Sequence, residues 1–80
     1  MAVNTRKESK RIPLQKAIWC KLRYWQSLQD ISDSDLACYL GCSERTLHNY
    51  DIDPSALTLK TVDSFLLVND MTLSEFLTSA

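Results

Sequence analysis

The sequence predicts an all-α fold: a compact five-helix domain with a helix-turn-helix at its centre. Three observations lead to this fold class. The chain has 80 residues, enough for one domain. Its apolar residues recur at spacings of three and four rather than two. The only glycine, Gly41, lies between two short helical patterns, where it can adopt a positive φ and turn one helix into the next.

The chain is expected to divide into a flexible basic N-terminal arm, residues 1–12, and a helix-turn-helix domain, residues 13–80. Residues 1–25 contain seven Lys and Arg and one Glu, whereas residues 26–80 contain two Lys and Arg and nine Asp and Glu. A basic arm on an acidic body suggests a polyanionic partner for the arm. The alternative is an ordinary solvated tail.

The first helix is expected over residues 13–28. Pro13 suits a first turn, where its missing N–H costs nothing. Trp19 and Tyr24 fall off the main apolar face, so they are expected either to face a partner or to lie flat on the surface. The face predicted to be buried comprises Leu14, Ala17, Ile18, Leu22, Trp25 and Leu28.

The helix-turn-helix is expected to consist of helices over residues 33–40 and 44–51. Ser32 and Ser43 are placed to cap them, because a side-chain oxygen there can accept from a free backbone N–H. The residues predicted to point inward are Leu36, Ala37, Leu40, Leu47 and Tyr50. The residues predicted to share the outward face of the second helix are Glu44, Arg45, His48 and Asn49.

Two further helices are expected after a loop at residues 51–55. One spans residues 59–68 behind the cap Thr58, and a short last one follows Thr72, which forms a capping box with Glu75. The first of these helices has Leu59, Val62, Phe65 and Leu66 on one face, and the apolar residues of the last helix are Leu73, Phe76 and Leu77.

The motif and the helices around it also match the pattern of a known family. The matching positions are Leu22, Trp25, Ile31, Leu36, Ala37, Leu40, Gly41, Ser43, Thr46, Leu47, Tyr50, Thr58, Leu59, Val62, Phe65, Thr72, Leu73, Glu75, Phe76 and Leu77. With these residues the chain resembles the Cro/CI-type (Xre family) helix-turn-helix domains of phage repressors and bacterial regulators, which have a lambda-repressor-like fold. The resemblance covers residues 14–78.

The resemblance implies a cytoplasmic transcription regulator that binds double-stranded DNA as a homodimer, with helix 44–51 in the major groove. By position, the implied DNA-binding residues are Ser43, Glu44, Arg45, Thr46, His48 and Asn49 of the motif, joined by Arg6, Lys7, Lys10 and Arg11 of the arm. Their chemistry suits bases: Arg45 can bond guanine bidentately, Asn49 adenine, and Glu44 can accept from cytosine. The arm would add a salt-sensitive share of affinity.

Acidic residues rim this expected DNA face: Asp33, Glu44, Asp51 and Asp53. Because carboxylates repel phosphate, and Arg45 is the only permanent cation expected on the face, a second function stays open. It is a helix-turn-helix protein-interaction module, an antirepressor or modulator of repression that binds a partner repressor. The apolar residues available for its contact patch are Trp19, Tyr24, Leu67 and Val68.

Other chemistry is not predicted. The cysteines Cys20, Cys38 and Cys42 are odd in number, which favours a reducing, cytoplasmic setting. Cys38 and Cys42 followed by His48 match no zinc spacing and lack a fourth ligand. His48 has no nucleophile or orienting carboxylate at a convincing spacing, and a single glycine cannot form a phosphate loop. No apolar run approaches the roughly 20 residues of a membrane span. We therefore expect that the protein is not an enzyme and that it binds no cofactor, metal or membrane.

Overall fold

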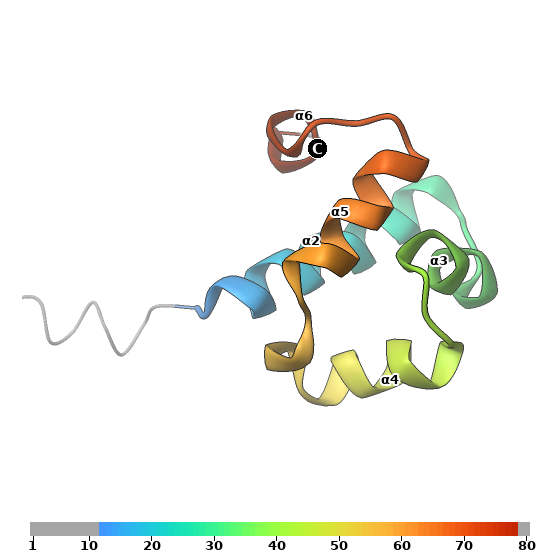
Figure 1. Ribbon diagram of the computed structural model, residues 1–80, viewed down its shortest axis with the longest axis vertical. Coiled ribbons are helices and arrows are strands. Elements are labelled where there is room, and N and C mark those ends of the chain that lie inside the picture. The colour runs from blue at the N-terminus through green and yellow to red at the C-terminus, as the bar shows by residue number, and fades with distance from the viewer. Residues whose placement is uncertain (1–11, 79–80) are drawn as a thin grey trace, which may run out of the picture.

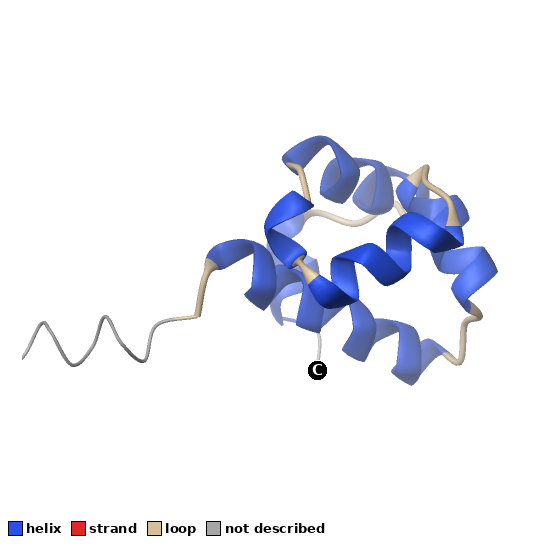
Figure 2. Cartoon of the chain, turned by 90° about the horizontal axis from the view of Figure 1, so that it is seen from below, coloured by secondary structure: helices blue, strands red, loops and turns tan. Residues whose placement is uncertain are grey.

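The computed structural model of the protein describes residues 12–78, and their regular segments are all helical (Figure 1). The elements are α2 (Leu14–Gln29), α3 (Asp33–Leu40), α4 (Glu44–Ile52), the 3-10 helix η1 (Pro54–Ala56), α5 (Leu59–Val68) and α6 (Leu73–Thr78). Only short loops connect these helices (Figure 2). The five α-helices confirm the all-α class, within the part of the chain that the structure describes.

The predicted helices at 33–40 and 59–68 have the predicted bounds, and the first helix lies one residue further along the chain than expected. The predicted loop at 51–55 is wrong in two respects. Asp51 and Ile52 continue α4, and Pro54 opens η1. Pro54 disfavours a helical Asp53 before it, and the Asp53 side chain then accepts from Ser55 N at 3.2 Å, which starts the new helix.

Side-chain caps start the helices at the predicted places. Thr72 and Glu75 form a reciprocal box at α6, with Thr72 N donating to Glu75 Oε1 at 2.8 Å and Glu75 N donating to Thr72 Oγ1 at 3.1 Å. The other caps each accept from the backbone N–H three residues ahead: Ser32 at 3.1 Å, Ser43 at 3.1 Å and Thr58 at 3.2 Å. Local chemistry thus sets where each of these helices begins.

The turn between α3 and α4 depends on Gly41. Its φ of 74° lies in the left-handed region, where a side chain would be strained. Gly41 N donates to the Cys38 carbonyl at 3.1 Å and Cys42 N to the Ala37 carbonyl at 3.0 Å, so the end of α3 is closed by its own backbone. A three-residue turn therefore joins α3 to α4.

Each α-helix contributes one fully buried residue to the core: Leu22, Leu36, Leu47, Phe65 and Phe76. Aromatic rings connect the layers edge to face, because Phe65 lies 4.8 Å from the Trp25 ring centroid and 5.5 Å from that of Phe76. α3 packs against both α4 and α5, and η1 packs against α2 and α4. The core thereby fixes α3 and α4 on the rest of the domain.

The buried face of α2 differs from the predicted one. Trp19 is only 3% exposed, so neither surface position expected for it is correct. Its ring packs edge to face on Tyr50 of α4, 5.1 Å away, and this contact turns α2 so that Trp19 faces inward. As a consequence Leu14, Ala17 and Leu28 lie exposed rather than in the core.

The start of α5 also differs from the prediction. Leu59, the first residue of α5, is exposed, because the chain enters that helix at the edge of the domain. Leu57, in the loop before it, is buried and was not predicted. The residues of α3 and α4 predicted to point inward are buried, as are Val62, Phe65 and Phe76. Leu66 is half-buried, and Leu73 and Leu77 are exposed.

Candidate nucleic-acid interface

The two faces of α4 have the predicted character. Leu47 and Tyr50 are buried, which holds the helix on the domain. The outward side carries four exposed polar residues that differ in charge and hydrogen-bonding capacity: Glu44, Arg45, His48 and Asn49. Helical periodicity places these four side chains together, since positions three and four apart share a face.

Ser43 and Thr46 form the N-terminal cap of α4. Ser43 Oγ accepts from Thr46 N, and the two hydroxyl oxygens lie 3.1 Å apart. Both predicted site residues are therefore occupied in capping the helix. Ser43 is exposed, and Thr46 is half-buried.

The arm residues of the predicted site, Arg6, Lys7, Lys10 and Arg11, lie outside the described residues. The predicted flexible arm shares only Ile12 with the described part of the chain, and Ile12 is exposed. The candidate site in the structure therefore consists of α4 and the residues that hold it.

A guanidinium that was not predicted as a site residue ties α4 to the other helices. Arg23 of α2 donates from Nε to Asp51 Oδ1 at 3.1 Å and from Nη2 to Asp51 Oδ2 at 2.7 Å. Its Nη1 donates to Asp33 Oδ1 at 2.8 Å, at the start of α3. One side chain thus contacts the first turn of α3 and the last turn of α4, the two outer ends of the motif.

Two more side chains of α2 complete this cluster. The buried Gln26 donates from Nε2 to Asp33 Oδ1 at 2.8 Å and to the Ile31 carbonyl at 3.0 Å, while its Oε1 accepts from Arg23 Nη1 at 2.6 Å. Trp19 donates from Nε1 to Asp51 Oδ1 at 2.8 Å, and its ring centroid lies 5.4 Å from the Arg23 Cζ atom. Both aspartates therefore have several protein donors.

These contacts lower the pKa of both carboxyl groups. For Asp33 the strongest cause is the hydrogen bond from Gln26, followed by those from His48 and Arg23. For Asp51 the strongest cause is the hydrogen bond from Arg23, and Trp19 adds to it. The pKa of Arg23 is raised in turn, chiefly by its hydrogen bond to Asp51.

His48 links the outward face of α4 to this cluster. Its Nε2 lies 3.0 Å from Asp33 Oδ2, so the imidazole N–H can donate to a carboxylate that Arg23 and Gln26 also bind. His48 is exposed and lies beside Asn49 on the chain. Its ring is thereby held at the edge of the outward face rather than left to rotate freely.

The cluster changes the charge expected around the candidate interface. Asp33 and Asp51 are each paired with Arg23, although their side chains stay 36% and 41% exposed to solvent. Asp53 accepts from Ser55, next to it in η1. Arg45 and Glu44 are exposed and take part in no ion pair among residues 12–78. The acidic rim predicted from the sequence is therefore partly compensated within the protein.

The roles of Arg23, Gln26 and Trp19 were missed because their partners lie far along the chain. Arg23 is 28 residues from Asp51, and Trp19 is 32 residues from it. A usable signal was present: Trp19, Arg23 and Gln26 follow one another at spacings of four and three, a polar stripe along one side of α2.

Other sites find no support among the described residues. No three His, Cys, Asp or Glu side chains of this part of the chain gather as a metal ion would require. Cys20, Cys38 and Cys42 are free thiols, and burial raises the pKa of Cys42. None of the helices within residues 12–78 has the length and apolar character needed to cross a membrane.

Comparisons with protein-family models, with curated proteins and with solved structures give no match to this chain.

Proposed function

We propose that the protein is a sequence-specific DNA-binding transcription regulator of the Cro/CI repressor type, with α4 in the major groove of double-stranded DNA. The observation that carries this proposal is the outward face of α4. Arg45 and Asn49 are exposed there, on a helix whose opposite side is anchored in the core. Arginine and asparagine are the residue types that recognise guanine and adenine edges by paired hydrogen bonds.

The Arg23 cluster supports the same reading. Two carboxylates near α4 are bound by a guanidinium, so they repel an approaching phosphate less than free carboxylates would. Because the cluster holds both outer ends of the helix-turn-helix, α4 also loses little conformational entropy when it binds. In the proposal Arg6, Lys7, Lys10 and Arg11 supply further phosphate contacts and most of the salt dependence.

The proposed setting is the cytoplasm of a bacterial host, with the gene carried by a phage or another mobile element. The three free thiols fit a reducing compartment. No cofactor or metal enters the proposed activity, because base and phosphate recognition needs only the side chains of α4 and the arm.

The proposal is tested by selecting binding sites from a random double-stranded DNA library at low salt. The full chain should enrich one motif, and a chain that lacks residues 1–12 should enrich the same motif with lower yield. The arm contacts phosphates in this account, whereas α4 specifies the sequence. Failure of the full chain to enrich any motif would reject the proposal.

A protein-interaction module is the second candidate, and one observation favours it: Tyr24, Leu67 and Val68 are large apolar side chains that lie exposed. Trp19, which was expected to join them, is buried. A pull-down against the regulator encoded beside this gene distinguishes the candidates. Capture of that regulator by a chain without DNA affinity would favour the module, and capture of DNA alone would reject it.

A further inference from the structure

His48 is the only histidine of the chain, and it lies on the outward face of α4. Its side chain is 56% exposed, and its Nε2 lies 3.0 Å from Asp33 Oδ2. Because an ionised carboxylate accepts hydrogen bonds and cannot donate them, the neutral imidazole carries its proton on Nε2. The lone pair is then on Nδ1, which forms no hydrogen bond within residues 12–78, so a second proton would bind there.

The partner of His48 keeps its charge while the imidazole changes. Gln26 and Arg23 each donate to Asp33 Oδ1 at 2.8 Å, and the hydrogen bond from Gln26 is the main reason why the pKa of this carboxyl lies well below its usual range. Imidazole is the side-chain group that ordinarily changes charge between about pH 8 and about pH 6. A fall in pH within this interval therefore adds charge to the ring and leaves Asp33 ionised.

The charged groups around His48 belong to three helices. Two guanidiniums and three carboxylates bind its partner or lie within one turn of it on α4: Arg23 of α2, Asp33 of α3, and Glu44, Arg45 and Asp51 of α4. The helix η1, which also packs against α4, contains no charged residue. With a neutral imidazole this surface has one more negative than positive charge, and the second ring proton balances it. A protonated His48 therefore reduces the repulsion that a phosphate meets at α4.

We propose that DNA binding by this protein is coupled to the uptake of one proton by His48, so that the protein binds DNA more tightly as pH falls from 8 to 6. The inference rests on the proposed function, since the coupling requires α4 to lie against DNA. The proton comes from the solvent and binds to Nδ1, while the Nε2–H bond to Asp33 is kept. The imidazolium then offers Nδ1–H as a donor to a phosphate oxygen. Because linkage is reciprocal, bound DNA favours the protonated ring by the same factor by which the proton favours DNA.

The test is the affinity of the full chain for the enriched duplex, measured by fluorescence anisotropy at about pH 6 and about pH 8 and at one salt concentration. The wild type should bind at least about threefold more tightly at pH 6, as expected for one additional phosphate contact. His48→Gln should lose this difference, because its amide can still donate to Asp33 but does not titrate. Every other titratable group is the same in both proteins, so the change in pH dependence belongs to His48.

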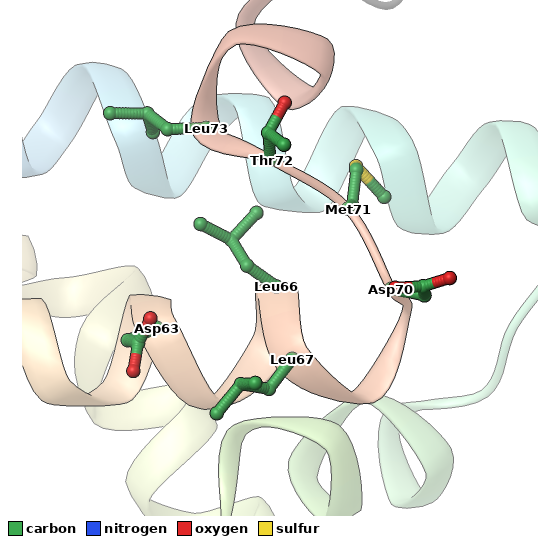
Figure 3. A pocket seen from close by; sticks show the side chains of 7 residues that line it. All are labelled: Asp63, Leu66, Leu67, Asp70, Met71, Thr72 and Leu73. Carbon is green, nitrogen blue, oxygen red and sulfur yellow. The ribbon is translucent and has the colours of Figure 1, made fainter.

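A histidine moved to another helix is the matched control. Leu67 of α5 is 73% exposed and lines a hollow of α5, α6 and the loop between them, which contains no residue of α4. Figure 3 shows Leu67 between Asp63 and Asp70, so a histidine there would also lie near carboxylates. The double variant with His48→Gln and Leu67→His should bind DNA with no more pH dependence than His48→Gln. Circular dichroism checks that each variant is folded.

Salt dependence gives a second measurement of the same proton. If the imidazolium contacts a phosphate, the slope of log affinity against log salt should be steeper by about 0.9 at pH 6 than at pH 8. His48→Gln should have the same slope at both values. The single histidine also permits a direct measurement by nuclear magnetic resonance, because its Cε1–H signal follows protonation without overlap from another histidine. That signal should titrate at a higher pH in the complex than in the free protein.

Each result separates this inference from the function on which it rests. A wild type that binds the duplex equally well at both pH values, a His48→Gln variant that keeps the pH dependence, or a Cε1–H titration unchanged by DNA would overturn proton coupling and leave DNA binding standing. A relocated histidine that restores the pH dependence would show that the position of His48 beside Asp33 is irrelevant, and would also overturn it. A wild type that binds no DNA at either pH would reject the proposed function and the coupling together.

Discussion

Arg23 and Asp51 form a two-point ion pair, with Nε 3.1 Å from Oδ1 and Nη2 2.7 Å from Oδ2. The pair joins the middle of α2 to the last turn of α4. Because the guanidinium fork and the carboxylate are both planar, such a pair fixes orientation as well as distance. It therefore helps to set the direction in which α4 presents its outward face.

Replacement of Arg23 should destabilise the protein. Arg23→Met keeps much of the packing on Trp19 but leaves Asp33 and Asp51 without their cation. Since the pair is partly exposed, the expected loss is about 1–2 kcal/mol in the free energy of unfolding. Urea denaturation measures it. The control Lys16→Met, on the same helix and exposed, should change stability by less than about 0.5 kcal/mol, and an equal loss there would contradict the account.

The contribution of Asp51 should depend on pH in a defined direction. Its folded pKa lies below the unfolded value of about 3.9, so its stabilisation is complete above that pH and is lost as pH falls toward the folded pKa. Asp51→Asn should therefore be less stable than the wild type at pH 7, and the difference should shrink below about pH 4. Urea midpoints at several pH values provide the comparison. A difference independent of pH would show that the carboxylate charge is irrelevant.

Substitutions of Gly41 should destabilise the protein through backbone strain rather than through steric clash of the new side chain. A Cβ added at Gly41 would meet only Ser64 Oγ at 3.6 Å, an ordinary contact, but the φ of 74° is strained for any residue with a side chain. Gly41→Ala should lower stability by about 1–2 kcal/mol. Gly41→Asn should lose less, because asparagine tolerates this region better. Thermal melting orders the two variants, and the reverse order would be inconsistent with backbone strain.

Much of the fold follows from local signals in the sequence. The caps at Ser32, Ser43, Thr58 and Thr72 and the left-handed Gly41 all act within a few residues, so a pattern along the chain reveals them. The outward side of α4 was predictable for the same reason, since it needs only the helical period. What those side chains bind is a different question, and it stays a prediction.

The missing parts depend on contacts between distant segments. The burial of Trp19 follows from its packing on Tyr50, and no periodicity within α2 contains that information. Leu57 lies in a loop but is buried by the helices around it, whereas loop residues are usually predicted to lie on the surface. The pairing of Arg23 with Asp51 likewise exists only once α2 and α4 are packed together. From the sequence, Asp51 is therefore expected to repel phosphate, whereas in the structure it forms an ion pair that joins the two helices.

The most direct test of the account is the binding of the selected duplex, followed by fluorescence anisotropy at about 50 and about 200 mM salt. The wild type should bind at low salt and lose affinity steeply at high salt. Arg45→Ala, which removes an exposed side chain without an ion pair among the described residues, should cost about 1–3 kcal/mol and relax the preference at one base pair. Absence of salt-dependent binding by the wild type, or an Arg45→Ala variant with unchanged affinity and preference, would contradict the proposed role of α4.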